Sequence, residues 1–366
     1  MTLIKVKSRG TDNVSGRRNL IINGAMQVAQ RGTTSTGVNG YYTVDRFRIY
    51  NGSVGTLTTS QESSNGPTDV PKYSFKVAAT NTASTSTSSD AWIRYVIETK
   101  DIENIPNITD STKNFTVSFY VKCSNTGQSS IGIASGSYSS AQYVHPYTIA
   151  AADTWQRVSV TIPGNSLLSN VSGDFGIRMY WDTGAGTDYQ TSSTNQWITS
   201  GDYAAAGNLQ IIGVNGRYLQ ITGVQFELGD SASDFEHRSF TEELQLCQRY
   251  YFKSMDSPPA DNIPNTDTTS GNGYMGFVMY ANTSGRSPYF YFPVEMRTDP
   301  SVTIYSSERA NTSGRFGIFT GVWGATASST PVVDVKRAAF GITTSSGTST
   351  GNSYLMAGGF DANADF

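Results

Sequence analysis

Short segments in which apolar and polar residues alternate run through most of this chain, and clusters of Gly, Ser, Thr and Asn separate them. Alternation with a period of two places the apolar side chains on one face of a strand, and the intervening clusters favour turns. Strands this short, with almost no helical periodicity between them, predict an all-β protein that begins with a jelly-roll β-sandwich. The segments predicted as strands before residue 230 are 20–28, 42–50, 92–98, 115–122, 154–162, 175–181 and 218–228.

One helix is predicted, and it starts near residue 240. Ser239 can cap it, and Glu242 stands three residues later, as a capping box requires. Leu244, Cys247 and Tyr251 then follow at helical spacing. We expect this helix to connect two β domains.

A second, smaller β-sandwich domain is predicted after a stretch rich in Pro and Thr. Six strand candidates occupy it, at 274–280, 289–297, 301–305, 331–335, 338–343 and 353–357. The predicted organisation is therefore an N-terminal attachment arm (1–18), a jelly-roll, carbohydrate-binding-like domain (19–238), a connecting helix (239–254) and a C-terminal β domain (255–366).

The composition argues against several classes of partner. Charged residues make up only 15% of the chain and the formal net charge is −3, so no basic stripe is available for a nucleic-acid backbone. The chain has no run of 18 apolar residues, and its first ten residues lack the apolar core of a signal peptide. We therefore expect no membrane insertion and synthesis in the cytoplasm. Cys123 and Cys247 lie far apart in different predicted elements, which indicates reduced thiols.

A series of short motifs resembles one family of virion proteins. The motifs are Asn-Leu-Ile-Ile-Asn-Gly (19–24), Gln-Arg-Gly (30–32), Tyr-Thr-Val-Asp-Arg-Phe (42–47), Trp-Gln-Arg-Val (155–158), Thr-Gly-Val-Gln-Phe-Glu-Leu-Gly (222–229), Asp-Phe-Glu-His-Arg-Ser-Phe (234–240) and Leu-Gln-Leu-Cys-Gln-Arg-Tyr-Tyr (244–251). In this order they resemble the tail-fibre and host-attachment proteins of tailed bacteriophages. The first domain is also similar to galactose-binding-like, carbohydrate-binding jelly rolls.

The resemblance implies a location and a set of partners. It implies a virion component, a tail-fibre or spike-like protein that is assembled in the host cytoplasm and binds polysaccharide on the host surface. It also implies a homotrimer, joined to other virion proteins through the N-terminal arm. Two alternatives stay open, namely a purely structural head-fibre, decoration or tail protein without a ligand, and a glycan-depolymerising enzyme.

A sugar-binding site needs aromatic faces together with polar forks that hydrogen-bond hydroxyl groups. The region 181–203 supplies this mixture between Gly-rich and Ser/Thr-rich segments that favour loops. We predict ligand-binding residues at Trp181, Asp182, Asp188, Tyr189, Trp197 and Tyr203. The alternative is that Trp181 and Trp197 belong to the core.

A structural calcium ion is a further expectation, because galactose-binding-like domains often carry one. Asn23 and Glu227 occupy the corresponding ends of the first domain and are its candidate ligands.

Catalysis is not expected. The carboxylates Asp174, Asp182 and Asp188 surround Tyr180 and Trp181, but the sequence shows neither a matched acid–base pair nor an internal repeat. The two histidines, His145 and His237, have no nucleophile at a suggestive spacing. The chain is therefore predicted not to be an enzyme.

Overall fold

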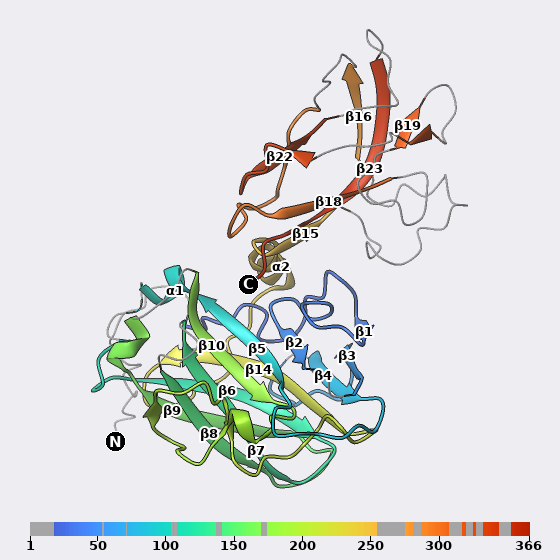
Figure 1. Cartoon of the computed structure of the whole chain (residues 1–366). Coiled ribbons are helices and arrows are strands. Elements are labelled where there is room, and N and C mark those ends of the chain that lie inside the picture. Colours follow the sequence, from blue (N-terminus) through green and yellow to red (C-terminus); the bar gives the residue numbers. More distant parts are fainter. Residues whose placement is uncertain are drawn as a thin grey trace, which may run out of the picture. The chain divides into compact units, whose positions relative to one another are not determined.

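The computed structural model describes residues 18–52, 55–70, 72–103, 105, 108–136, 141–169, 174–254, 275–280, 287–306, 317–319, 325–326, 332–343 and 353–366. The chain divides into two compact units (Figure 1). The first comprises Met1–Ala29, Thr33–Arg238 and Phe366, and the second comprises Gln30–Gly32 and Ser239–Asp365. The predicted arm and the Pro-rich stretch between residues 255 and 274 lie outside the described residues.

Two six-stranded antiparallel sheets make up most of the first unit. The first sheet has the order β1-β3-β4-β14-β6-β9, and the second has the order β12-β8-β7-β10-β5-β2. The strands are β1 (Thr34–Thr36), β2 (Arg48–Asn51), β3 (Leu57–Glu62), β4 (Ser74–Ala79), β5 (Ala91–Glu98), β6 (Asn114–Cys123), β7 (Gly127–Ser135), β8 (Gln142–Ile149), β9 (Gln156–Pro163), β10 (Phe175–Asp182), β12 (Trp197–Ile198) and β14 (Tyr218–Leu228). The expectation of an all-β protein with a jelly-roll sandwich is confirmed.

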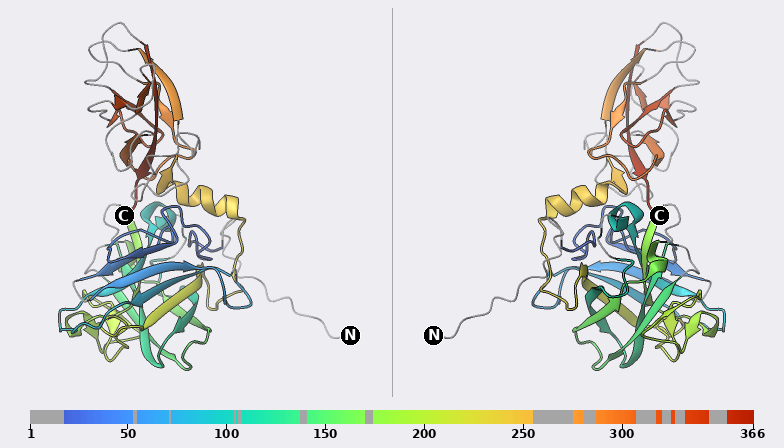
Figure 2. Two further views of the ribbon diagram at one scale, coloured as in Figure 1. Left: turned by 90° about the vertical axis from the view of Figure 1, so that its right-hand side faces the viewer. Right: turned by 90° about the vertical axis from the view of Figure 1, so that its left-hand side faces the viewer.

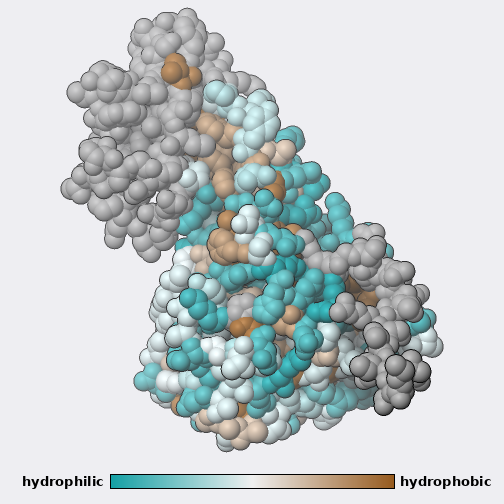
Figure 3. Space-filling view, turned by 180° about the vertical axis from the view of Figure 1, so that it is seen from behind, coloured by the Kyte–Doolittle hydropathy of each residue, from teal (hydrophilic) through white to brown (hydrophobic). Residues whose placement is uncertain are grey.

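Shorter elements complete this unit. They are the helix α1 (Thr99–Glu103), the 3-10 helices η1 (Ser166–Ser169) and η2 (Thr187–Tyr189), and the parallel pair β11 (Gln190–Thr191) and β13 (Ala204–Ala205). Figure 2 shows the same elements from two further sides. On the face shown in Figure 3, hydrophilic residues predominate and hydrophobic ones are scattered.

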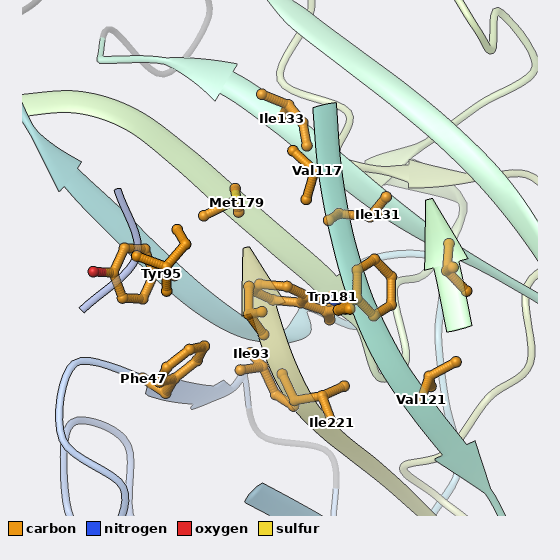
Figure 4. Packing of buried hydrophobic residues seen from close by; sticks show 14 of the residues in the cluster. Phe47, Ile93, Tyr95, Val117, Val121, Ile131, Ile133, Met179, Trp181 and Ile221 are labelled. Atoms are coloured by element: carbon orange, nitrogen blue, oxygen red, sulfur yellow. The ribbon is translucent and has the colours of Figure 1, made fainter. Parts of the chain in front are cut away.

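The core lies between the two sheets and follows the alternation of the strands. On β5, Ile93, Tyr95 and Ile97 point inward. Trp181 from β10 is fully buried and lies near Ile93, Tyr95 and Phe47 (Figure 4). Its ring centre is 5.6 Å from that of Phe119 and 6.1 Å from that of Phe47. The other side chains of β5 and β10 therefore point to the outer face of the second sheet.

The segment 20–28, predicted as a strand, is instead a loop of turns, and so is most of 42–47. The reason is local hydrogen bonding by side chains, which competes with strand pairing. Asn19 Nδ2 donates to the carbonyl of Val224 (3.1 Å), and Asn19 Oδ1 accepts from the amide of Phe226 (3.1 Å). A Cβ on Gly24 would lie 2.2 Å from the Val224 oxygen, so only glycine permits this approach. The loop is thereby held against β14.

Two other motifs also serve the architecture. Arg46, which is buried and has a φ of 75°, donates to the carbonyl of Val96 on β5 (2.6 Å). Glu236 accepts from the amide of Asn19 (2.5 Å), and Arg238 donates to the carbonyl of Ile21 (2.8 Å). The contacts of Glu236 and Arg238 join the first and last segments of the first unit.

The predicted helix is present as α2 (Phe240–Gln248), which ends before Tyr251, the last residue of the helical pattern in the sequence. Ser239 caps it by accepting from the amide of Glu242 (3.2 Å). Both cysteines are buried thiols, as the sequence indicated. In the same unit the Arg31 guanidinium lies 3.6 Å from the centre of the Tyr251 ring and pairs with Asp365.

Strand β23 (Ser353–Asn363) pairs with β15, β16, β18 and β19 in the larger sheet of the second unit, and a separate sheet has the order β17-β22-β21. The core of the second unit contains the aromatic residues Phe292, Phe340 and Phe360. The strands are β15 (Tyr251–Lys253), β16 (Met275–Tyr280), β17 (Phe290–Tyr291), β18 (Ser301–Ser306), β19 (Gly317–Phe319), β20 (Ala325–Thr326), β21 (Val332–Val333), β22 (Ala339–Ile342) and β23 (Ser353–Asn363).

Candidate functional site

The structure separates the six predicted ligand-binding residues. Trp181 has 0% of its surface exposed and lies in the core between the sheets. Trp181 therefore cannot contact a ligand, and its prediction as a ligand-binding residue is wrong. The reason is register, because Trp181 falls at an inward position of β10 between Met179 and the end of the strand.

Asp182 is buried as well, and its predicted contact with a ligand is also wrong. Its Oδ1 accepts from the amides of Gly184 and Ala185 (2.8 Å each), and its Oδ2 accepts from Asn208 Nδ2 (2.7 Å). Burial raises the pKa of Asp182, and these hydrogen bonds lower it in part. Asp182 therefore holds the segment 183–212 to the outer face of the second sheet.

Tyr203, on that same segment, is buried, so it supports a surface rather than forming one. Its hydroxyl donates to Asp90 (2.7 Å), and its ring lies 6.0 Å from the ring of Tyr189. Tyr189 is partly exposed and Asp188 is exposed, both in η2. Solvent can therefore reach Asp188 and Tyr189, and their role as ligand-binding residues stays a prediction.

Trp197 lies on β12, at the other edge of the second sheet from β2. It is partly exposed, packs edge-on against Tyr143 at 5.6 Å, and donates from Nε1 to the carbonyl of Pro163 (2.8 Å). It therefore does not belong to one patch with Tyr189.

A different set of side chains comes together on the outer face of β2, β5 and β10. The cross-strand pairs place Tyr50 opposite Trp92, and Arg48 opposite Arg94, which is itself opposite Tyr180. Directly opposite residues of a sheet point to the same side. We call this set, with Arg178 two residues before Tyr180 on β10, the arginine–aromatic face: Arg48, Tyr50, Trp92, Arg94, Arg178 and Tyr180.

Aromatic rings form the centre of this face. Tyr50 stacks on Trp92, with ring centres 5.1 Å apart and an interplanar angle of 22°. Tyr180 packs edge-on against Trp92 at 5.5 Å and lies 5.3 Å from Tyr203. Tyr50 of this face and the neighbouring Tyr189 are partly exposed, whereas Trp92 and Tyr180 are buried. The result is a rigid aromatic floor with two rings accessible at its rim.

Guanidinium groups lie beside these rings. Arg94 and Arg48 stand 5.0 Å and 5.8 Å from the centre of the Trp92 ring. Burial is the largest cause that lowers the pKa of Arg48, followed by the charge of Arg94. The face thus combines planar donors with aromatic surfaces, the mixture that sugar recognition needs.

Asp90 borders the face and accepts a hydrogen bond from the Tyr203 hydroxyl. Burial raises the pKa of Asp90, and hydrogen bonds from Tyr203 and Trp92 lower it in part. Asp90 can accept a hydrogen bond from a ligand hydroxyl only through a lone pair that Tyr203 and Trp92 do not occupy.

A second aromatic surface lies on the outer face of the first sheet. Lys76 stands 4.7 Å from the Tyr218 ring, and Lys122 stands 5.0 Å from the Trp155 ring. Here carboxylates accompany the cations, because Asp153 and Glu62 act to raise the pKa of Lys122 against burial. This balance of charge is typical of an ordinary solvated surface, so the outer face of the first sheet is a natural control for the second.

The proposed calcium ligands do not fit a metal ion. Asn23 Nδ2 donates to the carbonyls of Val28 and Asp45 (2.9 Å each), and Asn23 Oδ1 accepts from the amide of Val28. Glu227 accepts three hydrogen bonds from Gln225 and Ser233 and lies 3.6 Å from Arg18. Among the described residues no group of three or more His, Cys, Asp and Glu side chains could hold a metal ion. We therefore derive no calcium site from this pair.

The remaining predicted chemistry is dispersed. His145 Nδ1, on β8, lies 2.7 Å from the Asn195 side-chain oxygen, and His237 packs edge-on against Phe235. Of the three catalytic candidates, Asp182 is buried and Asp174 and Asp188 are exposed. No helix in the described part of the chain is both long and apolar enough to cross a membrane.

Comparison with known proteins gives distant likenesses of fold. No protein-family model and no curated protein sequence matches the chain. Among solved structures, the enzymatically active domain of tailspike protein 4 of bacteriophage CBA120 is similar over 58% of this chain and 21% of that chain, with 12% identity and a TM-score of 0.30.

Two carbohydrate-binding modules are similar to a comparable extent. A xylan-binding CBM22 domain from Paenibacillus barcinonensis shares 13% identity, with a TM-score of 0.29, over 50% of this chain and 91% of that one. A family 11 module of a Clostridium thermocellum cellulase shares 13% identity, with a TM-score of 0.26, over 58% of this chain and all of that one.

The sequence alone did not predict the arginine–aromatic face. Tyr50, Trp92 and Tyr180 are far apart along the chain and become neighbours only through the order β10-β5-β2. The available signal was the alternation within 92–98, where Trp92 and Arg94 share one face and Ile93 and Tyr95 the other.

Proposed function

We propose that this protein binds polysaccharide on a host surface through the outer face of β2, β5 and β10, and that it does so as a structural component of a virion. The observation that supports the proposal is the arrangement of Tyr50, Trp92 and Tyr189 beside guanidinium groups on the outside of a sandwich sheet. Aromatic rings cover the apolar faces of sugar rings, and planar donors hydrogen-bond their hydroxyl oxygens.

The rigidity of the face favours binding. Trp92 is held between Tyr50 and Tyr180, and Tyr203, fixed by its hydrogen bond to Asp90, supports Tyr189. Side chains already fixed in place lose little conformational entropy when a ligand docks.

The virion role rests on the motif resemblance and on multivalency. A homotrimer would present three such faces, so that weak contacts to a repeating polymer add into a tight attachment. Within this proposal, residues 1–18 attach the protein to its virion neighbours, and the protein acts without catalysis.

Binding is tested on an array of bacterial surface glycans, and then by affinity electrophoresis in the polysaccharides that bind the protein on the array. A double variant, Tyr50→Ala with Tyr189→Ala, is compared with Tyr120→Ala and Tyr218→Ala on the other sheet. We expect the first pair to weaken binding about tenfold, because an aromatic contact contributes about 0.5–1.5 kcal/mol, and the second pair to leave it unchanged.

Two results would overturn the proposal. The first is a folded protein that binds no glycan on the array and does not adsorb to any host cell surface. The second is a double variant of Tyr50 and Tyr189 that keeps the native fold and native affinity. A loss of viscosity of the polymer during incubation would instead identify the depolymerase alternative.

A further inference from the structure

Within the part of the chain that the structure describes, the three arginines of the arginine–aromatic face have no carboxylate partner. Within the described residues, none of Arg48, Arg94 and Arg178 takes part in any of the chain's salt bridges. Arg94 keeps only 8% of its surface exposed, and the buried Nε atoms of Arg94 and Arg178 have no hydrogen-bond partner. A buried N–H group without a hydrogen-bond partner costs free energy, because it has lost its contact with water and gained none in return.

Their positions make the arrangement costlier still. Arg48 lies directly opposite Arg94 in the ladder of β2 and β5. Arg178 lies two residues before Tyr180, the partner of Arg94, and is therefore a diagonal neighbour of Arg94, at about 7–8 Å between Cα atoms. Like charges directly opposite each other destabilise a sheet. The fold thus places three positively charged side chains close together, although their repulsion lowers the stability of the sheet.

Among the described residues, the acidic side chains nearby form no ion pair with these arginines. Asp90 accepts from Tyr203 (2.7 Å), and Asp182 is occupied by the segment 183–212. Glu98 lies four residues beyond Arg94 on β5 and is buried. The largest electrostatic influences on Arg48 are Arg94 and three tyrosines, with no carboxylate among them. The lysines on the other sheet, by contrast, have Asp153 and Glu62 beside them.

We propose that the polysaccharide bound by this face is acidic, and that Arg48, Arg94 and Arg178 bind the carboxylates of its uronic-acid or other acidic sugar units. The inference rests on the proposed function and adds the class of glycan to it. A carboxylate accepts two parallel hydrogen bonds from one guanidinium, a geometry that a neutral sugar hydroxyl does not offer. The partly exposed rings of Tyr50 and Tyr189 would then cover the apolar face of the same or the next unit.

The test uses polymers that differ only in their charged group. Polygalacturonate and hyaluronate are each compared with the same polymer after reduction of its carboxyl groups to alcohols, and dextran sulfate serves as a polyanion without carboxylates. Affinity is measured by calorimetry on the full-length chain, at two salt concentrations. We expect at least one carboxylated polymer to bind about tenfold or more tightly than its reduced form, and dextran sulfate to bind more weakly than that polymer.

Variants test whether these arginines cause the preference for the carboxylated polymer. Arg48→Gln and Arg94→Gln are expected to abolish the preference for the carboxylated polymer. Arg48→Lys keeps the positive charge but lacks the planar guanidinium group, so this variant should retain part of the preference for the carboxylated polymer. The matched control is Arg157→Gln, since Arg157 is an exposed arginine 6.0 Å from the Tyr120 ring on the other sheet. Because Arg94 is buried and its variant can unfold, Arg48→Gln, at a partly exposed position, decides the result.

The outcomes separate the two proposals. Equal binding of reduced and carboxylated polymers, or equal binding of dextran sulfate, overturns the inference that these arginines recognise carboxylates and leaves glycan binding itself intact. An Arg48→Gln chain that folds correctly and keeps the preference overturns it in the same way. Failure to bind any of these polymers together with failure on the array of neutral and acidic surface glycans overturns both.

Discussion

At the scale of the residue, the same residue type serves opposite roles according to its register in a strand. Trp181 is an inward residue of β10 and fills the core, whereas Trp92 is an outward residue of β5 and stacks with Tyr50. The mixture of aromatic and acidic residues in 181–203 predicted one ligand-binding surface. In the structure Trp181 lies in the core, Tyr203 is buried beneath Tyr189, and Tyr189 is partly exposed. A ligand site in a sandwich is therefore decided by which face each strand position occupies.

Replacing Trp181 tests its place in the core. We expect Trp181→Ala to lower the free energy of unfolding by about 3–5 kcal/mol, because it removes a large buried ring and leaves a cavity. Urea denaturation measures this, with Tyr189→Ala as a partly exposed control that should change stability much less. A Trp181→Ala chain as stable as the unmodified one would show that the ring is not part of the core.

The buried carboxylate Asp182 gives stability a pH dependence. Burial raises its folded pKa above the unfolded value of about 3.9. The stability that this group contributes is then fully present below that unfolded pKa and is lost as the pH rises through the folded pKa. We expect the unfolding free energy, relative to Asp182→Asn, to be lower near pH 7 than near pH 3. Denaturation of both chains at the two pH values checks this, and a difference that stays constant or grows with pH contradicts it.

At the scale of the element, the strands that alternate clearly could be predicted from the sequence, and the segments fixed by side-chain hydrogen bonds could not. The segment 218–228 is β14 with the predicted ends, and α2 starts at its predicted cap. The segment 20–28 alternates equally well, yet Asn19 and Asn23 bind backbone groups and turn it into a loop. Strands β3, β4, β7 and β8 are rich in Ser, Thr and Gln or have short apolar runs, so their sequences resemble turns.

The candidate site was harder to predict than the fold. Of the six predicted residues, only Asp188 and Tyr189 lie beside the arginine–aromatic face in positions that a ligand can reach. The others were misplaced because pairing between distant strands, rather than neighbourhood in the sequence, brings Tyr50, Trp92 and Tyr180 together.

The segment 183–212 depends on a close approach to β7. A Cβ on Gly132 would lie 2.4 Å from the carbonyl oxygen of Tyr203. We expect Gly132→Ala to push this segment outward, to cost about 1–3 kcal/mol of stability, and to weaken glycan binding because Tyr203 supports Tyr189. Hydrogen exchange should rise in residues 183–209. Ala134→Gly, at the next outward position of β7, is the control, and unchanged exchange in Gly132→Ala would show that the approach does not depend on this glycine.

At the scale of the whole molecule, attachment to a cell surface requires several faces in one particle. In the single chain, Tyr289 is 51% and Tyr291 75% exposed. Exposed aromatics of this size favour burial against a partner. The proposed trimer would cover them and multiply the arginine–aromatic face threefold.

Light scattering tests the trimer. We expect a mass about three times the 39.5 kDa of the chain at micromolar concentration. Tyr289→Ser with Tyr291→Ser should shift the species toward monomer without unfolding it, and should weaken adsorption to cells more than binding to a short oligosaccharide. A stable monomer of the unmodified chain would rule the trimer out.

Glycan binding by the outer face of β2, β5 and β10 is tested most directly by hydroxyl-radical footprinting of the unmodified chain, with and without the polysaccharide that binds it. We expect protection of Tyr50 and Tyr189, and of Trp92 as far as its small exposed surface reports. Tyr120, Trp155 and Tyr218 on the other sheet should show no change. Protection confined to the other sheet, with Tyr50 and Tyr189 oxidised as in the free protein, would contradict binding at this face.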